Sequence, residues 1–402
     1  MRRLLKASGG IQAASVLTLA AQNLLAPRLM GAASYGQAVA LMALPLLLQG
    51  IVEPMVNGAA IAARSGANYF SVVRRSWTHL GVAVLPVGLL TLGLGMQREA
   101  TTLQLTLLAA FVVLVMVNTA LRGLAFAGQR HGVLVGHFLG ALAATVAMLP
   151  VLGVAGVSGY LGMMCFVQAV VCGMLLGDRE VRAEAAAIVA ARRTSASGFD
   201  FLRIYAANLA QRASQLALGP GMLLLASGQL APSRLAEFRV AQVIVGALGY
   251  VVPIHPTLVQ AHSALAEPVA GNPSSSHVKG LVGAMVVGLG LAAAGTVALW
   301  LAFPWVAAFL LRRPFEGGLV FEFRNMIWAA PFFVSLPVLG GLLLGRSLET
   351  VVLVLNLVLV PASVAVGVWK GAAVGFVSGS LALAVSLAVA AWWVLRFDPN
   401  PE

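Results

Sequence analysis

Long apolar runs recur along the whole chain and constrain its fold more than any other feature. Hydrophobic residues make up 60% of the 402 residues and charged residues only 9%, and the mean hydropathy is +0.94. A transmembrane helix needs about 20 predominantly apolar residues, and runs of that length predict about twelve spans here. The spans lie over 10–30, 37–62, 77–95, 103–125, 132–151, 156–176, 200–226, 236–259, 280–310, 324–344, 350–367 and 372–395. We therefore expect an all-α polytopic membrane protein.

The positive charge predicts the orientation of these spans. The net charge is +12, but most basic residues lie in loops or at span ends, so we expect no nucleic-acid partner. With the N-terminus inside, fourteen of the 25 Lys and Arg residues lie on the cytoplasmic side, six lie outside, and five lie in or at the ends of spans. Because cytoplasmic loops carry an excess of Lys and Arg, we predict that both termini are cytoplasmic.

The longest charged connection divides the spans six and six. It carries acids near its start and an arginine pair near its end, as a helix dipole favours, and it predicts a cytoplasmic surface helix. Each half opens with a span that has a polar line along one face, so we expect two pseudo-symmetric six-helix bundles. The predicted parts are an N-terminal bundle over 1–177, a linker helix over 178–199 and a C-terminal bundle over 200–402. The two cysteines, Cys165 and Cys172, predict packing inside one span rather than a disulfide or a metal site.

The span over 200–226 is the least suited to lipid. At about 100° per residue, five of its residues fall within an arc of roughly 80°. They are Tyr205, Asn208, Arg212, Gln215 and Gly219. A charge at the middle of a membrane costs about 2.5–3.5 kcal/mol on insertion scales, so this face should line a cavity or a pathway. Pro220 and Gly221 interrupt the helix and predict a hinge.

Glu53 is the only carboxylate deep inside a predicted span. An intramembrane acid has a partner or a function. Two interpretations stay open at this point: a structural ion pair with Arg212 or Arg122, and a site for a coupling proton. A pair between Glu53 and Arg212 across the cavity is the sharper expectation, because it would join the two halves.

Four stretches carry a resemblance to a known family. They are LLAPRLMGAASYGQAVA over 24–40, the segment 50–64 with Glu53 near its start, LRGLAFAGQR over 121–130, and 228–256 with its AEFRVAQ and late proline. Together they resemble the polysaccharide-export (O-antigen flippase-like) branch of the multidrug/oligosaccharidyl-lipid/polysaccharide (MOP) flippase superfamily. The resemblance implies a MATE-like, V-shaped pair of bundles around a cationic central cavity. It also implies a bacterial inner-membrane flippase that moves an undecaprenyl-diphosphate-linked oligosaccharide outward by alternating access, for lipopolysaccharide or exopolysaccharide biosynthesis.

Candidate substrate-binding residues follow from the charge and the amides. Arg212, and with it Arg122, would bind the diphosphate, since the planar guanidinium suits phosphate oxygens. Arg239 would line the mouth of the cavity, although Arg122 and Arg239 lie near span ends, where anchoring is the alternative. The amides that would bind sugar hydroxyls are Gln22, Asn23, Asn208, Gln215 and Gln242. The same amides could instead join helices, where such hydrogen bonds contribute about 0.6 kcal/mol on average.

Other functions remain as alternatives. A cation-coupled multidrug exporter of the same superfamily would favour acids over arginines in the cavity. A membrane-embedded saccharide polymerase or acyltransferase would need a sizeable outside loop or a deep histidine with carboxylate partners. The chain has no Gly-rich loop ending in Gly-Lys-Ser/Thr, so we expect no ATP-driven transport. We expect no enzyme activity, cofactor or metal. The expected partners are the bilayer, the lipid-linked substrate, and a polysaccharide polymerase or glycosyltransferases, with the chain itself monomeric.

Overall fold

The computed structural model describes residues 2–64, 66, 68–191, 201–249, 275–312, 322–344 and 349–397. Within these ranges the regular structure is entirely helical. Seven of the described helices are long and apolar enough to cross a membrane. They are Ala32–Ala63, Tyr69–Gln97, Thr102–Ala127, His131–Gly177, Leu289–Leu311, Val351–Lys370 and Ala372–Ala390. The prediction of an all-α, multi-pass membrane protein is confirmed.

The first part of the chain forms helices that match the predicted spans. They are α1 (Arg2–Ala20), the π-helix η1 (Ala21–Leu25), α2 (Ala26–Met30), α3 (Ala32–Ala63), α4 (Tyr69–Gln97), α5 (Thr102–Ala127), α6 (His131–Gly177) and α7 (Arg179–Ala190). The helix α6 contains two predicted spans. Gly156 separates them, because its backbone (φ 51°, ψ −125°) departs from helical geometry.

The second part follows the predicted spans equally closely. Its elements are α8 (Phe201–Leu216), the π-helix η2 (Ala217–Gly221), α9 (Met222–Gln229), α10 (Pro232–Gly249), α12 (Ser275–Leu311), the 3₁₀ helix η3 (Arg324–Ala329), α13 (Ala330–Leu344), α14 (Glu349–Lys370) and α15 (Ala372–Phe397). The end of the predicted span 236–259 and residues 192–199 of the predicted linker lie outside the described residues.

Local sequence explains where several helices begin. Thr101 and Gln104 form a capping box at the start of α5, in which each side chain accepts a hydrogen bond from the other residue's backbone N–H. Asp178 caps α7 by accepting hydrogen bonds from the N–H groups of Glu180 and Val181. These caps satisfy N–H groups that a helix start leaves unpaired.

The two parts repeat one order of elements. Each begins with an α-helix, passes through a π-helical segment, continues in a short α-helix and turns into another helix. The π-helical segments η1 and η2 therefore occupy matching places in the two parts. Single π-turns are uncommon and often lie at functional sites, so this repeat directs attention to η1 and η2.

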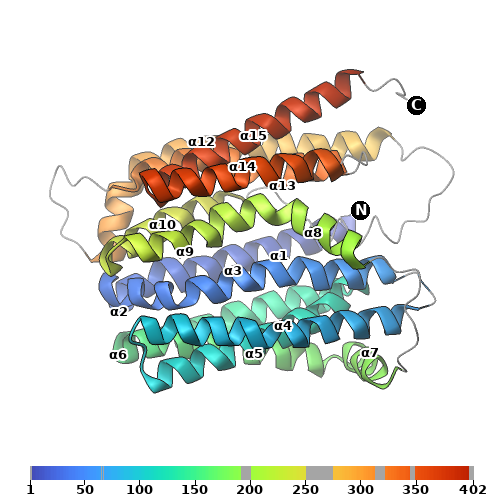
Figure 1. Cartoon of the computed structure of the whole chain (residues 1–402), viewed down its shortest axis with the longest axis horizontal. Coiled ribbons are helices and arrows are strands. Elements are labelled where there is room, and N and C mark those ends of the chain that lie inside the picture. Colours follow the sequence, from blue (N-terminus) through green and yellow to red (C-terminus); the bar gives the residue numbers. More distant parts are fainter. Residues whose placement is uncertain are drawn as a thin grey trace.

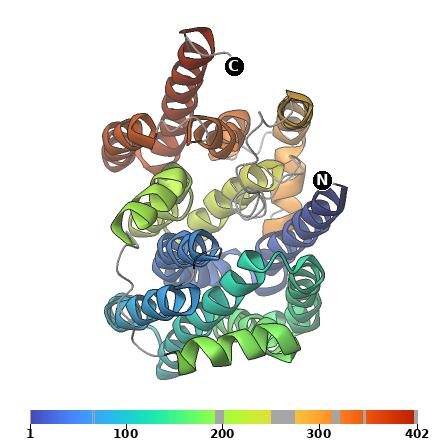
Figure 2. The same ribbon diagram turned by 90° about the vertical axis from the view of Figure 1, so that its right-hand side faces the viewer.

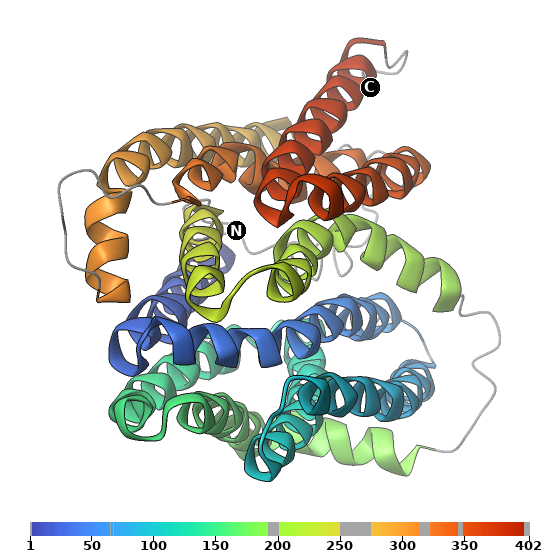
Figure 3. The ribbon, with the colours of Figure 1, turned by 60° about the vertical axis from the view of Figure 1, so that its left-hand side comes forward.

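Most helices run roughly side by side, while α7 lies across them (Figures 1 and 2). The helices α8 and α10 lie between α3–α7 on one side and α12–α15 on the other (Figures 1 and 3). The start of α1, the helix α7 and the end of α15 lie at one end of the molecule, here called the proximal end (Figures 1 and 2). The distal end carries the turns at Gly31, 98–101, 230–231 and Gly371. The largest apolar cluster includes buried residues from both parts, among them Tyr35, Phe111, Phe238 and Phe376. The division into two bundles at the boundaries given above stays a prediction.

Candidate functional site

The helix α3 forms the junction between the two parts of the chain. It packs along both α8 and α10, and glycines allow the close approach. A Cβ atom on Gly36 would lie 1.8 Å from the carbonyl oxygen of Pro232 in α10. A Cβ atom on Gly58 would lie 2.2 Å from the amide nitrogen of Asn208 in α8. Backbone and side chains of the two parts therefore meet directly along α3.

A hydrogen-bonded cluster crosses this junction in the distal half. The Oδ1 atom of Asn23, in η1, accepts hydrogen bonds from the hydroxyl of Tyr35 and from Nε of Arg239, both at 3.1 Å. The Nδ2 group of Asn23 donates to the carbonyl of Leu19 at 3.1 Å. Asn23 and Tyr35 are buried, and Arg239 is half-buried. The structure therefore brings together the predicted site residues Asn23 and Arg239 from opposite parts of the chain.

The cluster continues from Arg239 into the second π-helical segment. Its Nη1 group donates to Oε1 of Gln242 at 2.7 Å. The Nε2 group of Gln242 then donates to the backbone carbonyl of Gly219, in η2, also at 2.7 Å. Together with Asn23 in η1, these contacts form an unbroken series of hydrogen bonds between the two matching π-helical segments. Below we call these four residues, Asn23, Arg239, Gln242 and Gly219, the relay.

Tyr35 is a member of this cluster that sequence reasoning misses, since a tyrosine at a span end is most often interfacial. Its burial is complete, and its ring packs edge-on against Tyr160 with centroids 5.8 Å apart. A buried tyrosine hydroxyl needs a hydrogen-bond partner, and Asn23 supplies it. The sequence signal that could have indicated this contact is the position of Tyr35 shortly after the polar line of the first span, which contains Asn23.

One residue of the predicted polar face of α8 packs directly against α3. Asn208 is buried beside Gly58, and its Nδ2 group donates to its own helix at Ile204 O, at 2.8 Å. Arg212 and Gln215, one and two turns further along, are half-buried. The structure therefore places three predicted substrate-binding residues on the helix that faces the other part of the chain.

Glu53 forms an ion pair with Arg122 of α5, at 2.6 Å. Only 20% of the Glu53 side chain and 10% of the Arg122 side chain are exposed, so the pair is largely desolvated. The pair with Arg122 was one of the alternatives that the sequence left open. The sharper expectation, a pair between Glu53 and Arg212, stays a prediction. In this structure the charge of Glu53 is balanced inside the N-terminal part.

Two further predicted residues have local roles. Gln22 donates from Nε2 to the hydroxyl of Thr145 in α6, at 3.0 Å, which is the helix-joining role that the sequence left open. Pro220 and Gly221 lie within η2, so the chain continues through them as a π-helical turn and the helix does not end there. Proline removes one backbone donor and disturbs the preceding turn, which accounts for this irregular geometry.

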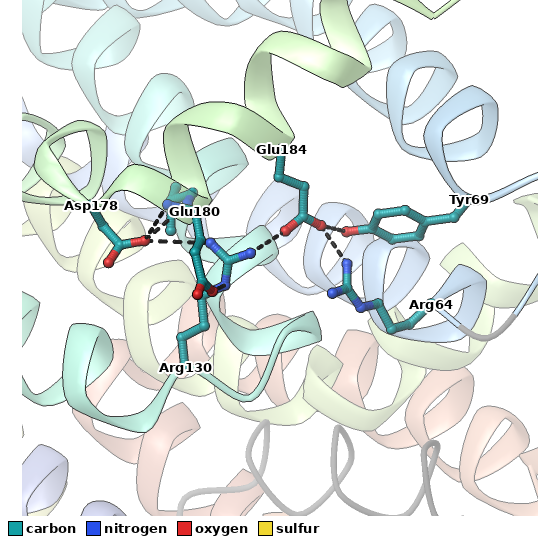
Figure 4. A network of polar contacts seen from close by, with 7 residues as sticks. Arg64, Tyr69, Arg130, Asp178, Glu180 and Glu184 are labelled. Atoms are coloured by element: carbon teal, nitrogen blue, oxygen red, sulfur yellow. Dashed lines mark hydrogen bonds and ion pairs between the residues drawn. The ribbon is translucent and has the colours of Figure 1, made fainter.

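A second polar network lies at the proximal end, where α7 meets the ends of α3, α4 and α5 (Figure 4). Glu184 accepts hydrogen bonds from Nη1 of Arg64, the hydroxyl of Tyr69 and Nη2 of Arg130, each at 2.5 Å. Arg130 also lies 3.5 Å from Oδ1 of Asp178. Burial acts to lower the pKa of Arg64, but the Glu184 carboxylate and the Tyr69 hydroxyl outweigh it, and the pKa is raised.

Sequence reasoning assigns these arginines only to membrane orientation and misses the network. The available signal was the spacing of Val181, Glu184 and Ile188, which share one face of α7 and are all buried. An acid on the apolar face of a short helix indicates a buried basic partner, because an unpaired buried charge is costly. The network therefore anchors α7 to the N-terminal part.

Contacts between the two parts also occur near both ends. At the proximal end the hydroxyl of Tyr205 in α8 donates to Oγ of Ser76 in α4, at 3.1 Å. At the distal end Nη2 of Arg98 donates to Oγ of Ser227 in α9, at 2.7 Å. Also at the distal end, Arg28 of α2 donates to the carbonyl of Phe309 in α12 at 2.6 Å, and its guanidinium stacks on that ring.

The fold of this chain is similar to that of several solved MATE transporters. A mutant of the Vibrio cholerae MATE transporter VcmN aligns with a TM-score of 0.56 at 14% identity, over 100% of this chain and 97% of that chain. The inward-facing structure of a multidrug resistance MATE family transporter of the MOP superfamily aligns with a TM-score of 0.55 at 12% identity, over 96% of each chain. The eukaryotic MATE transporter AtDTX14 gives 0.55 at 12% identity, over 96% of this chain and 94% of that chain. No family model and no curated protein matches the chain. The chain has the fold of MATE transporters.

Proposed function

We propose that this protein is a bacterial inner-membrane flippase that moves an undecaprenyl-diphosphate-linked oligosaccharide outward for cell-surface polysaccharide biosynthesis. The proximal end, with the start of α1, the end of α15 and α7, would face the cytoplasm. The two parts would rock against each other along α3, so that the site opens first to the proximal side and then to the distal side. The MATE fold and the positive-inside pattern support a transporter with this orientation.

One observation carries the choice of an anionic substrate. The guanidinium of Arg239, at the junction, is held by the neutral amides of Asn23 and Gln242. Its positive charge is therefore not cancelled by those partners. Glu53, the deep carboxylate, is already balanced by Arg122. A surface of this sign attracts a diphosphate and repels a cation.

Arg212 is the residue that we propose for the diphosphate contact. It is half-buried on the face of α8 that carries Asn208 and Gln215. A planar guanidinium binds two phosphate oxygens at once, and this interaction is stronger out of water. The neighbouring amides would then bind sugar hydroxyls, which have the same donor and acceptor chemistry.

The test is movement of a labelled lipid-linked oligosaccharide from the inner to the outer leaflet of proteoliposomes containing the full chain. Wild-type protein should make the saccharide accessible to an enzyme added outside, and Arg212→Ala should reduce the rate by at least tenfold. Arg234→Ala is the matched control, since Arg234 is exposed and pairs with Glu322 inside the second part. A strain that lacks the gene should accumulate the lipid-linked saccharide in the cytoplasmic leaflet. Unchanged sidedness together with a normal surface polysaccharide would exclude the flippase function.

The rival function is cation-coupled export of drugs. It is favoured by the similarity to a structure described as a multidrug resistance MATE family transporter. In that case Glu53 would carry the coupling proton, and Glu53→Gln would abolish efflux of a cationic dye such as ethidium. Dye efflux by wild-type protein, without any transport of lipid-linked saccharide, would decide for this rival.

A further inference from the structure

The relay connects two structural elements that are otherwise far apart in the sequence. Asn23 lies in η1, and Gly219 lies in η2. Between them stand only Arg239 and Gln242, both on α10. Each of the three hydrogen bonds is between 2.7 and 3.1 Å long. A change in the bend of one π-helical segment must therefore alter the relay or break it.

Only one of these bonds joins the two parts of the chain. It is the bond from Nε of Arg239 to Oδ1 of Asn23. The other two hold Arg239 and Gln242 against η2, within the second part. Tyr35 holds Asn23 from the opposite side, within the first part. The Arg239–Asn23 hydrogen bond is therefore held on each side by residues of a different part of the chain.

The bond is placed where it can control access from the distal side. Tyr35 lies close after the distal turn at Gly31, and Arg239 lies two turns after the start of α10 at Pro232. The same region contains the approach of Gly36 to Pro232. Opening of the distal side must separate these segments, and it therefore requires the bond between Arg239 and Asn23 to break.

The chemistry of the bond suits a reversible contact. A charged donor bound to a neutral amide makes a stronger hydrogen bond than two neutral groups, yet it lacks the full attraction of an ion pair. When the bond breaks, Arg239 keeps Gln242, and Asn23 keeps the hydroxyl of Tyr35. Neither side is then left with a buried polar group entirely without partners, which would be costly.

We propose that the Arg239–Asn23 bond is the distal latch of the transport cycle, and that the relay links its release to a change of bend at η2. Closed, the latch holds the distal ends of the two parts together, as in this structure. Released, it allows them to separate. The proposal rests on the proposed transport cycle, but it concerns the gate and makes no use of which molecule is carried.

The test is a distance measurement by electron–electron double resonance on the full chain in lipid nanodiscs. Cys165 and Cys172 are first replaced by alanine. Spin labels at Leu103 and Lys370, both exposed near the distal end, report on opening there. Labels at Arg182 and Leu202, both exposed near the proximal end, report on the separation of the two parts at that end.

Arg239→Gln should raise the ratio of distally open to distally closed protein by about tenfold, which corresponds to about 1.4 kcal/mol. The shift is partial because the contacts of Arg28 and Arg98 remain. The proximal distance should change less, because the hydrogen bond between Tyr205 and Ser76 near that end is left intact. Arg234→Gln is the control, since Arg234 lies on the same helix but pairs with Glu322 in its own part.

Asn23→Ala removes the acceptor of the same hydrogen bond. It keeps the proposal testable if Arg239→Gln does not fold. The double variant should shift the ratio no further than either single variant, because both remove one bond. Unchanged distances in correctly folded Arg239→Gln and Asn23→Ala would overturn the proposal. So would additive effects of the two changes, or an equal shift in Arg234→Gln. None of these outcomes depends on the saccharide assay, so the latch and the flippase function fail separately.

Discussion

Replacing Glu184 with alanine removes the carboxylate that three groups share at the proximal end. Arg64, Tyr69 and Arg130 each contact it at 2.5 Å, and only 7% of its side chain is exposed. Loss of one partner from a buried ion pair costs about 3–5 kcal/mol. Two features reduce that value here. The side chain of Arg64 is 30% exposed and can turn to water, and Arg130 keeps Asp178 at 3.5 Å.

We therefore expect Glu184→Ala to lower the free energy of unfolding by about 2–3 kcal/mol. In a chain of this size, that corresponds to a fall of about 3 °C in Tm. The measurement is thermal unfolding of the full chain in detergent, followed by tryptophan fluorescence. Glu184→Gln keeps the shape and one acceptor oxygen, so it should fall between wild type and Glu184→Ala.

Glu180→Ala is the matched control on the same helix. Glu180 lies 3.6 Å from Arg130, but 78% of its side chain is exposed. An exposed pair of this kind contributes about 0–1 kcal/mol, so Tm should move by no more than about 1 °C. If Glu184→Ala and Glu180→Ala lower Tm equally, the argument from burial is wrong.

Two further predictions concern the junction and the buried pair. Gly58→Ala should destabilise the protein by about 1–3 kcal/mol, because its Cβ would lie 2.2 Å from the Asn208 amide. Gly81→Ala is the control, because nothing lies within 4 Å of its Cβ, and it should not lower Tm. Glu53→Gln should destabilise the protein by about 3 kcal/mol by leaving Arg122 buried without its acid. Adding Arg122→Gln should restore Tm, because the buried charge without a partner is then removed. If the double variant is as unstable as Glu53→Gln alone, the ion pair does not stabilise the protein.

The helices themselves could be predicted from the sequence because the signals for them are local. Apolar length decides whether a segment can cross a bilayer, and breaks such as Gly156 and Pro220 mark where regular geometry changes. The predicted spans 37–62 and 103–125 differ from α3 and α5 by only a few residues at each end. The polar line of α8 also follows from residue spacing alone.

The candidate site could be predicted only as a set of residues, without its pairing. Asn23, Arg239 and Gln242 are polar residues in otherwise apolar spans, and the cost of burying them marks them as notable. Their spacing does not say which of them touch. Tyr35 and Glu184 escaped prediction because each looks ordinary in its own segment and acquires its role from residues distant in the chain.

By itself, the sequence determined an all-helical membrane protein, the positions of most of its helices and the residues that lipid would not tolerate. Only the tertiary structure decided that Glu53 pairs with Arg122, that Arg239 bridges to Asn23, and that η1 and η2 are joined by a relay. The physical reason is that hydropathy and capping act within a few residues along the chain. Side-chain partners depend instead on how helices rotate and cross, and here close approaches such as Gly36 against Pro232 set that packing.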